Sequence, residues 1–150
     1  MTDTRPVKEA LEAYFHAYGI DRGGYAVSTF RVPLGPLVLT FPNPGRLAQH
    51  DLHHVALGLP ATFWGEVENS AFELRTGVPN LVIGVLCVGA LLLGGVVAPR
   101  RVWRAWRRHP RGTSLYPRRS EQSALLAMSV SELRASMQLD RDALAPERVE

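Results

Sequence analysis

Apolar side chains recur three and four positions apart in several segments of the chain, which is the spacing that lines one face of a helix. Residues 7–18 show this pattern clearly, and Gly19 follows them as a helix stop. Near the carboxyl end, Ser129 stands three residues before Glu132, the spacing of a capping box, and apolar residues share one face of the segment that follows. Both segments are therefore predicted to form amphipathic helices.

The segment between residues 21 and 45 has a different pattern, in which apolar and β-branched residues are interrupted by prolines and glycines. Proline cannot donate a hydrogen bond to a sheet, so the sequence predicts an extended loop or a short hairpin here. Asn43 and Pro44 then offer a cap and a first position for a helix that ends at about Leu57, before Gly58. A further helix is predicted to open at Pro60 and to run to about residue 75.

Residues 81–97, LVIGVLCVGALLLGGVV, form the most apolar part of the chain and contain no charged side chain. With Ala98 this segment would make a helix about 27 Å long. Its length is therefore close to that of a membrane span, which requires ~18 residues. Its four glycines favour close packing against other helices. We therefore expect a central apolar helix, buried in the fold and lining a lipid channel, with a single membrane span as the alternative.

These segments predict an all-α fold, a compact multi-helix single domain over residues 1–139, with residues 140–150 as a flexible tail. A chain of 150 residues can bury about two thirds of its unfolded surface without disulfides. The single cysteine, Cys87, excludes an intramolecular disulfide. The amino-terminal residues carry acids and no continuous apolar stretch, so we expect no secretory signal and a cytoplasmic location.

Positive charge is concentrated in one part of the chain. The net charge is only +3, but residues 100–119 contain eight of the 17 lysines and arginines and no acidic residue. Because this segment directly follows the apolar run, we expect it to bind an anionic membrane surface, at the inner face of a membrane. A solvated helix face and nucleic-acid binding are the lower-ranked alternatives, and no nucleic-acid partner is expected. The residues predicted to face the membrane are Trp103, Arg104, Trp106, Arg107 and Arg108.

Titratable side chains gather in the first of the two adjacent helices predicted in the middle of the chain. On that helix His50, Asp51 and His54 share one sector, whereas His53 lies outside it and Leu52 belongs to the opposite, packing face. Two imidazoles four residues apart can bind one metal ion, and a carboxylate from a neighbouring segment can complete the site. The spacing alone leaves ordinary structural histidines as an equal alternative.

Glu66 on the second helix is the carboxylate predicted to complete this site, because the turn at Gly58 lets the two helices fold back antiparallel. Ser70 and Glu73 share the helical face of Glu66 and are candidates to orient the metal ligands through hydrogen bonds. For Glu73 alone, a place on a solvent-exposed stripe is the more common outcome. The H-E-x-x-H protease motif is absent, so hydrolysis is not expected.

The pattern H-D-x-x-H, followed by eleven residues and a glutamate, resembles the signature of the coenzyme Q (ubiquinone) biosynthesis protein four family. The surrounding sequence FPNPGRLAQHDLHHVALGLPATFWGEV is similar to the proline-asparagine-proline segment and the Gly-Glu pair of that family. The segment SVSELRASMQL also resembles its carboxy-terminal leucine-arginine helix. The resemblance extends over about residues 30–140.

The resemblance implies an all-α protein, peripheral at the membrane, that binds a divalent metal at His50, Asp51, His54 and Glu66, which are then also its catalytic residues. Zinc is the first expectation, with manganese and ferrous iron as alternatives, because imidazole and carboxylate ligands suit all three. The family replaces the carboxyl group at ring carbon 1 of a polyprenylated benzenoid precursor by a hydroxyl group, and it associates with other quinone-biosynthesis enzymes.

The implied function is therefore that of a metal-dependent enzyme of prenylquinone biosynthesis with a prenylated aromatic lipid as substrate. Two alternatives keep the same resemblance. One is a non-catalytic scaffold that binds prenyl lipid within a quinone-biosynthesis complex, and the other is a relative that acts on a different lipophilic aromatic metabolite. A homo-oligomer is compatible with all three.

Overall fold

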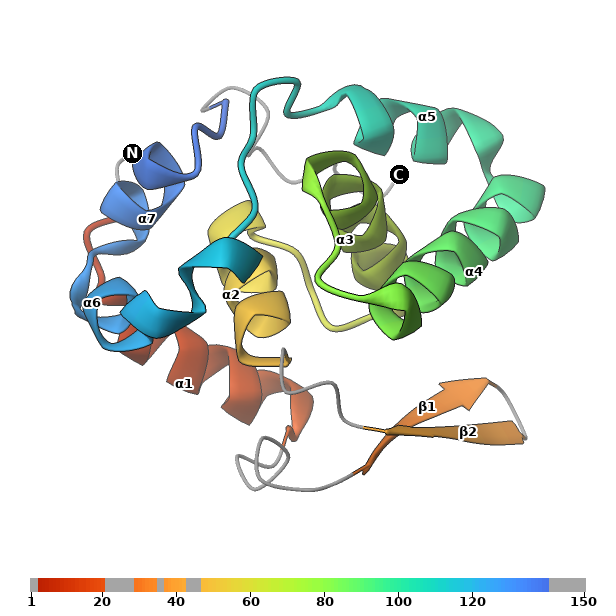
Figure 1. Cartoon of the computed structure of the whole chain (residues 1–150), viewed down its shortest axis with the longest axis horizontal. Coiled ribbons are helices and arrows are strands. Elements are labelled where there is room, and N and C mark those ends of the chain that lie inside the picture. The colour runs from red at the N-terminus through yellow and green to blue at the C-terminus, as the bar shows by residue number, and fades with distance from the viewer. Residues whose placement is uncertain (1–2, 21–28, 35–36, 43–46, 141–150) are drawn as a thin grey trace.

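Seven α-helices, one 3-10 helix and a two-stranded hairpin make up the described part of the chain in the computed structural model (Figure 1). The structure describes residues 3–20, 29–34, 37–42 and 47–140. In chain order the elements are α1 (Val7–Tyr18), β1 (Thr29–Leu34), β2 (Leu37–Pro42), α2 (Leu47–Leu57), α3 (Phe63–Thr76), α4 (Leu81–Val97), α5 (Pro99–Arg107), η2 (Tyr116–Glu121), α6 (Gln122–Ala127) and α7 (Val130–Ser136). The helices form the body of the molecule, which confirms the predicted all-α fold.

The hairpin is one of the two structures predicted for residues 21–45. Strands β1 and β2 pair antiparallel, from Thr29 opposite Pro42 to Leu34 opposite Leu37. The predicted cap and first position of the next helix, at residues 43–44, lie outside the described residues, as does nearly all of the predicted tail, residues 141–150.

Two helices begin or end at the local signals found in the sequence. α1 ends at Gly19, whose φ of 63° is left-handed and therefore suits glycine. α7 begins with the predicted capping box, in which Ser129 and Glu132 each hydrogen-bond the other's backbone. These ends could be predicted because the residues that stop or cap each helix act on their own neighbours.

The start of α3 differs from the prediction. The helix begins at Phe63, three residues after Pro60, and Thr62 caps it by accepting a hydrogen bond from the Gly65 backbone N–H at 3.4 Å. Pro60 suits the first turn of a helix, but the Thr62 hydroxyl satisfies an N–H that would otherwise lack a partner. The predicted start at Pro60 is therefore wrong.

The main hydrophobic core lies among α1, α2, α6 and α7, where Leu52 and Leu133 are fully buried. Backbone hydrogen bonds fix the start of α1 to the connection between α6 and α7, with the Val7 N–H donating to the Met128 carbonyl at 2.8 Å. Because Leu52 and its neighbours on α2 pack into this core, the histidine-bearing side of α2 faces α3. The fold thereby positions the candidate site.

The apolar helix α4 does not occupy the centre of the fold. It packs on α3 at one side of the molecule (Figure 1), and only Ile83, Cys87 and Gly94 are buried in it. The predicted buried helix lining a lipid channel is therefore wrong, because α4 has helical neighbours on only one face. Among the described helices, none combines the length and the apolar character needed to cross a membrane.

Only one of the four glycines predicted to favour packing in α4 lies at a close helix contact. A Cβ at Gly94 would meet the Val67 side chain of α3 at 2.8 Å, so the absence of a side chain lets α4 approach α3. Gly89 and Gly95 face open space, and a Cβ at Gly84 would make an ordinary contact.

A buried glutamate of α3 holds α5 in place. Glu68 accepts two hydrogen bonds from Arg101, at 2.9 and 2.8 Å, and one from Arg108 at 2.6 Å. The Arg101 guanidinium also covers the Trp64 ring, 4.6 Å from its centroid. Arg108 was predicted to face a membrane, but it points inward because a buried carboxylate requires a partner.

Candidate metal centre

His50 and His54, one turn apart on α2, lie against Glu66 in the first turn of α3. His50 Nε2 is 3.3 Å from Glu66 Oε2, and His54 Nε2 is 3.3 Å from Glu66 Oε1. One potential ligand atom from each of the three residues lies within 4.8 Å of the others. Three of the four predicted metal residues therefore converge on one point, between the two predicted helices.

The chemistry of this group fits a divalent metal. Zinc held tetrahedrally by bonds of about 2.0–2.1 Å places neighbouring ligand atoms about 3.3 Å apart. The His54 side chain is fully buried; among the described residues Nδ1 has no hydrogen-bond partner, and Nε2 meets only Glu66 Oε1, at ion-pair distance. Buried polar atoms rarely remain unpaired, and an ion bound at His54 Nε2 would satisfy one of these two.

Asp51, the fourth predicted ligand, is not part of the three-residue group. Burial, followed by the negative charges of Asp51 and Glu66, raises the pKa of Tyr14. The Tyr14 ring packs beside the His54 imidazole, with 5.7 Å between the ring centroids. Asp51 therefore lies near Tyr14, which packs beside His54, while its role as a metal ligand stays a prediction.

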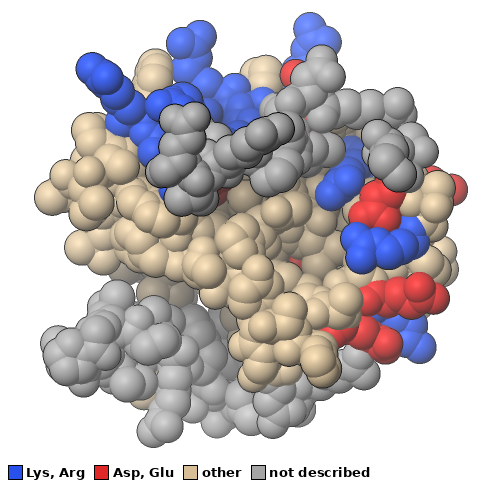
Figure 2. Space-filling view, turned by 180° about the vertical axis from the view of Figure 1, so that it is seen from behind, with Lys and Arg blue, Asp and Glu red and all other residues tan. Residues whose placement is uncertain are grey.

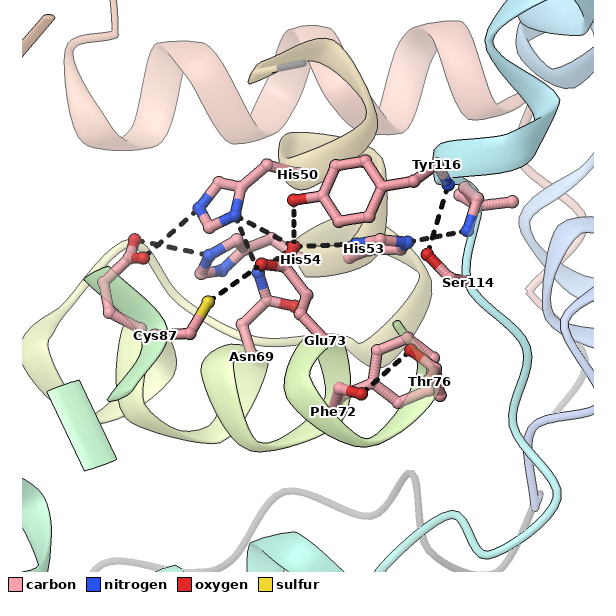
Figure 3. Close-up of polar contacts among 12 residues, drawn as sticks. His50, His53, His54, Asn69, Phe72, Glu73, Thr76, Cys87, Ser114 and Tyr116 are labelled. Carbon is pink, nitrogen blue, oxygen red and sulfur yellow. Dashed lines mark hydrogen bonds and ion pairs between the residues drawn. The ribbon is translucent and has the colours of Figure 1, made fainter. Parts of the chain in front are cut away.

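Glu73 lies behind the histidines and connects them to the rest of the protein (Figure 3). Its side chain is fully buried, so the alternative of a solvent-exposed stripe is wrong. Its Oε1 lies 3.0 Å from His50 Nδ1, 2.8 Å from His53 Nδ1 and 2.9 Å from the Tyr116 hydroxyl. A buried carboxylate is stable only when such donors replace water. This placement agrees with the predicted supporting role of Glu73.

The hydrogen bonds of this network determine where the protons lie. The Leu115 backbone N–H donates to His53 Nε2 at 2.9 Å, so His53 carries its proton on Nδ1 and donates it to Glu73. Burial, together with the neighbouring His50 and His54, lowers the pKa of His53 in spite of the opposing effect of Glu73. His53 is therefore neutral and outside the ligand group, as its helical position predicted, yet it contacts the same carboxylate as His50.

His50 has two neighbours at Nδ1, and the stronger acceptor decides its tautomer. Asn69 Nδ2 lies 3.2 Å from both His50 Nδ1 and Glu73 Oε1. Because a buried carboxylate is the better acceptor, the amide and the imidazole both donate to Glu73. When a metal ion replaces the proton on His50 Nε2, Glu73 keeps the remaining proton on Nδ1, which is the tautomer that a metal ligand requires.

Negative charge at the site favours a cation. Burial alone would lower the pKa of His50, but Glu73 and Glu66 outweigh it and raise that pKa well above its ordinary value. Burial would raise the pKa of both glutamates, yet the neighbouring His50 holds each well below its usual range. The carboxylates that favour a protonated His50 would equally favour a divalent ion beside it.

Cys87 of α4 also contacts Glu73 (Figure 3). Its thiol donates to Glu73 Oε2 at 3.5 Å, and burial together with that carboxylate raises the pKa of the thiol. Ser70, the other predicted supporting residue, is buried and lies close enough to this thiol to oppose the rise of its pKa. Ser70 thus supports Cys87 and is not in the ligand group.

Sequence reasoning missed two partners of Glu73. Asn69 stands three residues after Glu66 and four before Glu73, so helical spacing offered a signal for it. Tyr116 is 43 residues from Glu73, and no motif marks it. Burial and the Glu73 carboxylate raise the pKa of Tyr116, so its hydroxyl remains a donor.

The remaining residues predicted to face a membrane lie on α5. Trp103, Arg104 and Arg107 are exposed, and Trp106 is half-buried. The Arg107 guanidinium lies 5.6 Å from the centroid of the Trp103 ring. Of the five predicted residues, Arg108 alone pairs with the buried Glu68.

Comparison of the chain with protein-family models, curated proteins and solved structures found no significant match.

Proposed function

We propose that this protein is a metal-dependent enzyme that acts on a prenylated aromatic acid in prenylquinone biosynthesis. The observation that carries the proposal is the ligand group of His50, His54 and Glu66, with Glu73 hydrogen-bonded behind His50. Three protein ligands leave a position for water or substrate, which is the pattern of catalytic zinc sites, whereas structural sites are closed by four. The resemblance of the surrounding sequence supplies the substrate class.

The exposure of the three ligands indicates the side from which a substrate would approach. The Glu66 side chain is 44% exposed, whereas that of His54 is fully buried. A substrate carboxylate is therefore expected to reach the ion from the side of Glu66. Behind the histidines, Glu73 and its donors fill the space that water would otherwise occupy.

Zinc is the metal that we propose, with manganese and ferrous iron as alternatives. A divalent ion at this site would hold the substrate carboxylate and stabilise the negative charge that develops as carbon dioxide leaves. The protein's own residues fix the geometry. Glu73 keeps the proton of His50 on Nδ1, and His53 and Tyr116 hold Glu73 in place.

The proposed reaction is oxidative decarboxylation at ring carbon 1. The bond from the ring to the carboxyl carbon breaks, carbon dioxide leaves, and a hydroxyl group takes its place. This exchange oxidises the organic substrate by two electrons, so an external oxidant such as dioxygen is required. With a redox-inert metal, the substrate itself or another protein must activate that oxidant.

A non-catalytic scaffold that binds prenyl lipid is the second candidate, and the exposed apolar residues of α4 favour lipid contact in either case. In both, we propose a peripheral location at the membrane and association with other quinone-biosynthesis enzymes. The two candidates differ in turnover. A scaffold would retain its lipid unchanged whether or not metal is bound.

Turnover of a prenylated hydroxybenzoic acid labelled with ¹³C in its carboxyl group distinguishes them. With dioxygen present, we expect labelled carbon dioxide and the hydroxylated ring, both measured by mass spectrometry. Chelation should stop the reaction, and added zinc should restore it. Stoichiometric binding of the prenylated acid, with no labelled carbon dioxide under any metal loading, would identify a scaffold.

A further inference from the structure

One face of α4 is apolar and exposed along the length of the helix. The exposed fractions run from 46% at Val88 to 86% at Val96. The residues concerned are Leu81, Val85, Val88, Leu92, Leu93, Val96 and Val97. Five of them, at positions 81, 85, 88, 92 and 96, are spaced by three or four and so form one continuous stripe. No described helix covers this stripe.

A contiguous exposed apolar surface of this kind is typical of an interaction site. The opposite face of α4 supplies the contacts of the helix with the protein, through Ile83, Cys87 and Gly94. The stripe is therefore not needed to hold α4 against α3, and the buried face fixes the direction in which the stripe points.

The charges around the stripe indicate its partner. No aspartate or glutamate occurs between Glu73 and Glu121. α5 follows α4 after a single residue, and Arg100, Arg104 and Arg107 are exposed on it. Figure 2 shows Lys and Arg side chains gathered at the upper edge of a broad uncharged surface, with most of the visible acidic side chains on the other side of the molecule.

We propose that the exposed stripe of α4 and the exposed arginines of α5 form one docking face for an anionic lipid bilayer. The stripe would lie in the plane of the interface among the acyl chains, and the arginines would contact the headgroups. Trp103, which is 60% exposed, would lie at the depth that tryptophan prefers. A second copy of this chain fits less well, because it would bring its own positive charge.

Docking in this orientation would place the metal centre next to the bilayer. Cys87, on the buried face of α4, contacts Glu73, so the stripe and the ligand group are separated by about one helix diameter, on the order of 10 Å. The docking face is defined by exposure and charge alone. It therefore stands or fails independently of the metal chemistry.

Flotation of the full-length protein with vesicles tests the docking face. We expect binding to vesicles of 70% phosphatidylcholine and 30% phosphatidylglycerol, weaker binding to pure phosphatidylcholine, and a decrease with added salt. The double variant Leu92→Glu/Val96→Glu should bind at least tenfold more weakly even at low salt. A matched control, Ala124→Glu/Ala135→Glu, adds the same charge at exposed positions of α6 and α7 and should bind as the parent does.

Two further variants separate the apolar and charged parts. Arg100→Ser/Arg104→Ser/Arg107→Ser should lose at least tenfold in binding to the anionic vesicles and most of the salt dependence. Val88→Trp should instead strengthen vesicle binding several-fold, and its fluorescence should shift to the blue when vesicles are present. A gain in binding cannot be caused by poor folding of the variant, so this variant tests the stripe independently of the others. Parent-like vesicle binding by Leu92→Glu/Val96→Glu would overturn the proposal. Its conversion of a dimer to a monomer with unchanged vesicle binding would assign the stripe to a second copy.

Discussion

Replacing His54 by alanine is expected to lower zinc affinity at least a hundredfold. Loss of a hydrogen-bond partner behind a ligand typically lowers metal affinity by about 10–100-fold. The His54→Ala variant removes one of the three ligands itself, so its loss of affinity should be at the upper end of this range or beyond it. Since Glu66 is the one described polar contact of the His54 ring nitrogens, the metal-free protein should lose only packing and that contact. Competition with a chelator of known affinity measures the effect.

His109→Ala is the matched control for that experiment. His109 is also a buried histidine, but it lies beyond the end of α5 and outside the ligand group. The control should lose stability and keep the zinc affinity of the parent. Equal losses of zinc in the two variants would mean that affinity follows general folding, and the site at His50, His54 and Glu66 would be rejected.

Replacing Glu73 by glutamine is expected to weaken zinc binding by about 10–100-fold, although Glu73 is not itself in the ligand group. Glutamine has nearly the same size but no negative charge, and one of its two terminal atoms is a donor. It would no longer hold the Nδ1 proton of His50 as strongly, so the lone pair at Nε2 would be less available. Isothermal titration with zinc, on protein shown to be folded, measures this change.

Glu68→Gln provides the comparison, because Glu68 is a buried glutamate on the same helix as Glu73. Its partners are Arg101 and Arg108, so the variant should loosen α5 and leave zinc affinity unchanged. The positioning role assigned to Glu73 requires a difference between these two glutamine variants. If both weakened zinc binding equally, the effect would come from disturbance of α3 as a whole.

Local signals allowed the bounds of α4 to be predicted closely, whereas α5 and α6 were not predicted and α3 begins later than expected. The bounds of α4 at Leu81 and Val97 agree with the apolar run, because the run ends where proline and charge begin and Asn80 caps its first turn. The burial of α4 could not be predicted in the same way. Glycine-rich apolar sequences suit both a protein core and a lipid surface, and which one applies depends on how many neighbours the fold provides.

The candidate site also has a part that could be predicted from the sequence and a part that could not. His50 and His54 could be predicted to act together because the positions i and i+4 face the same way on any helix. The network behind them depends on long-range packing. His53 joins it through Glu73, and Tyr116 reaches the same carboxylate from η2, which no spacing rule connects with α3.

X-ray absorption spectroscopy of the full-length protein loaded with one equivalent of zinc tests the ligand group most directly. We expect nitrogen and oxygen ligands at about 2.0–2.1 Å, multiple scattering from two imidazoles and no sulfur ligand. In His54→Ala the scattering should fall to that of a single imidazole or the zinc should be lost. A sulfur ligand at about 2.3 Å, or an unchanged spectrum in His54→Ala, would contradict a metal centre formed by His50, His54 and Glu66.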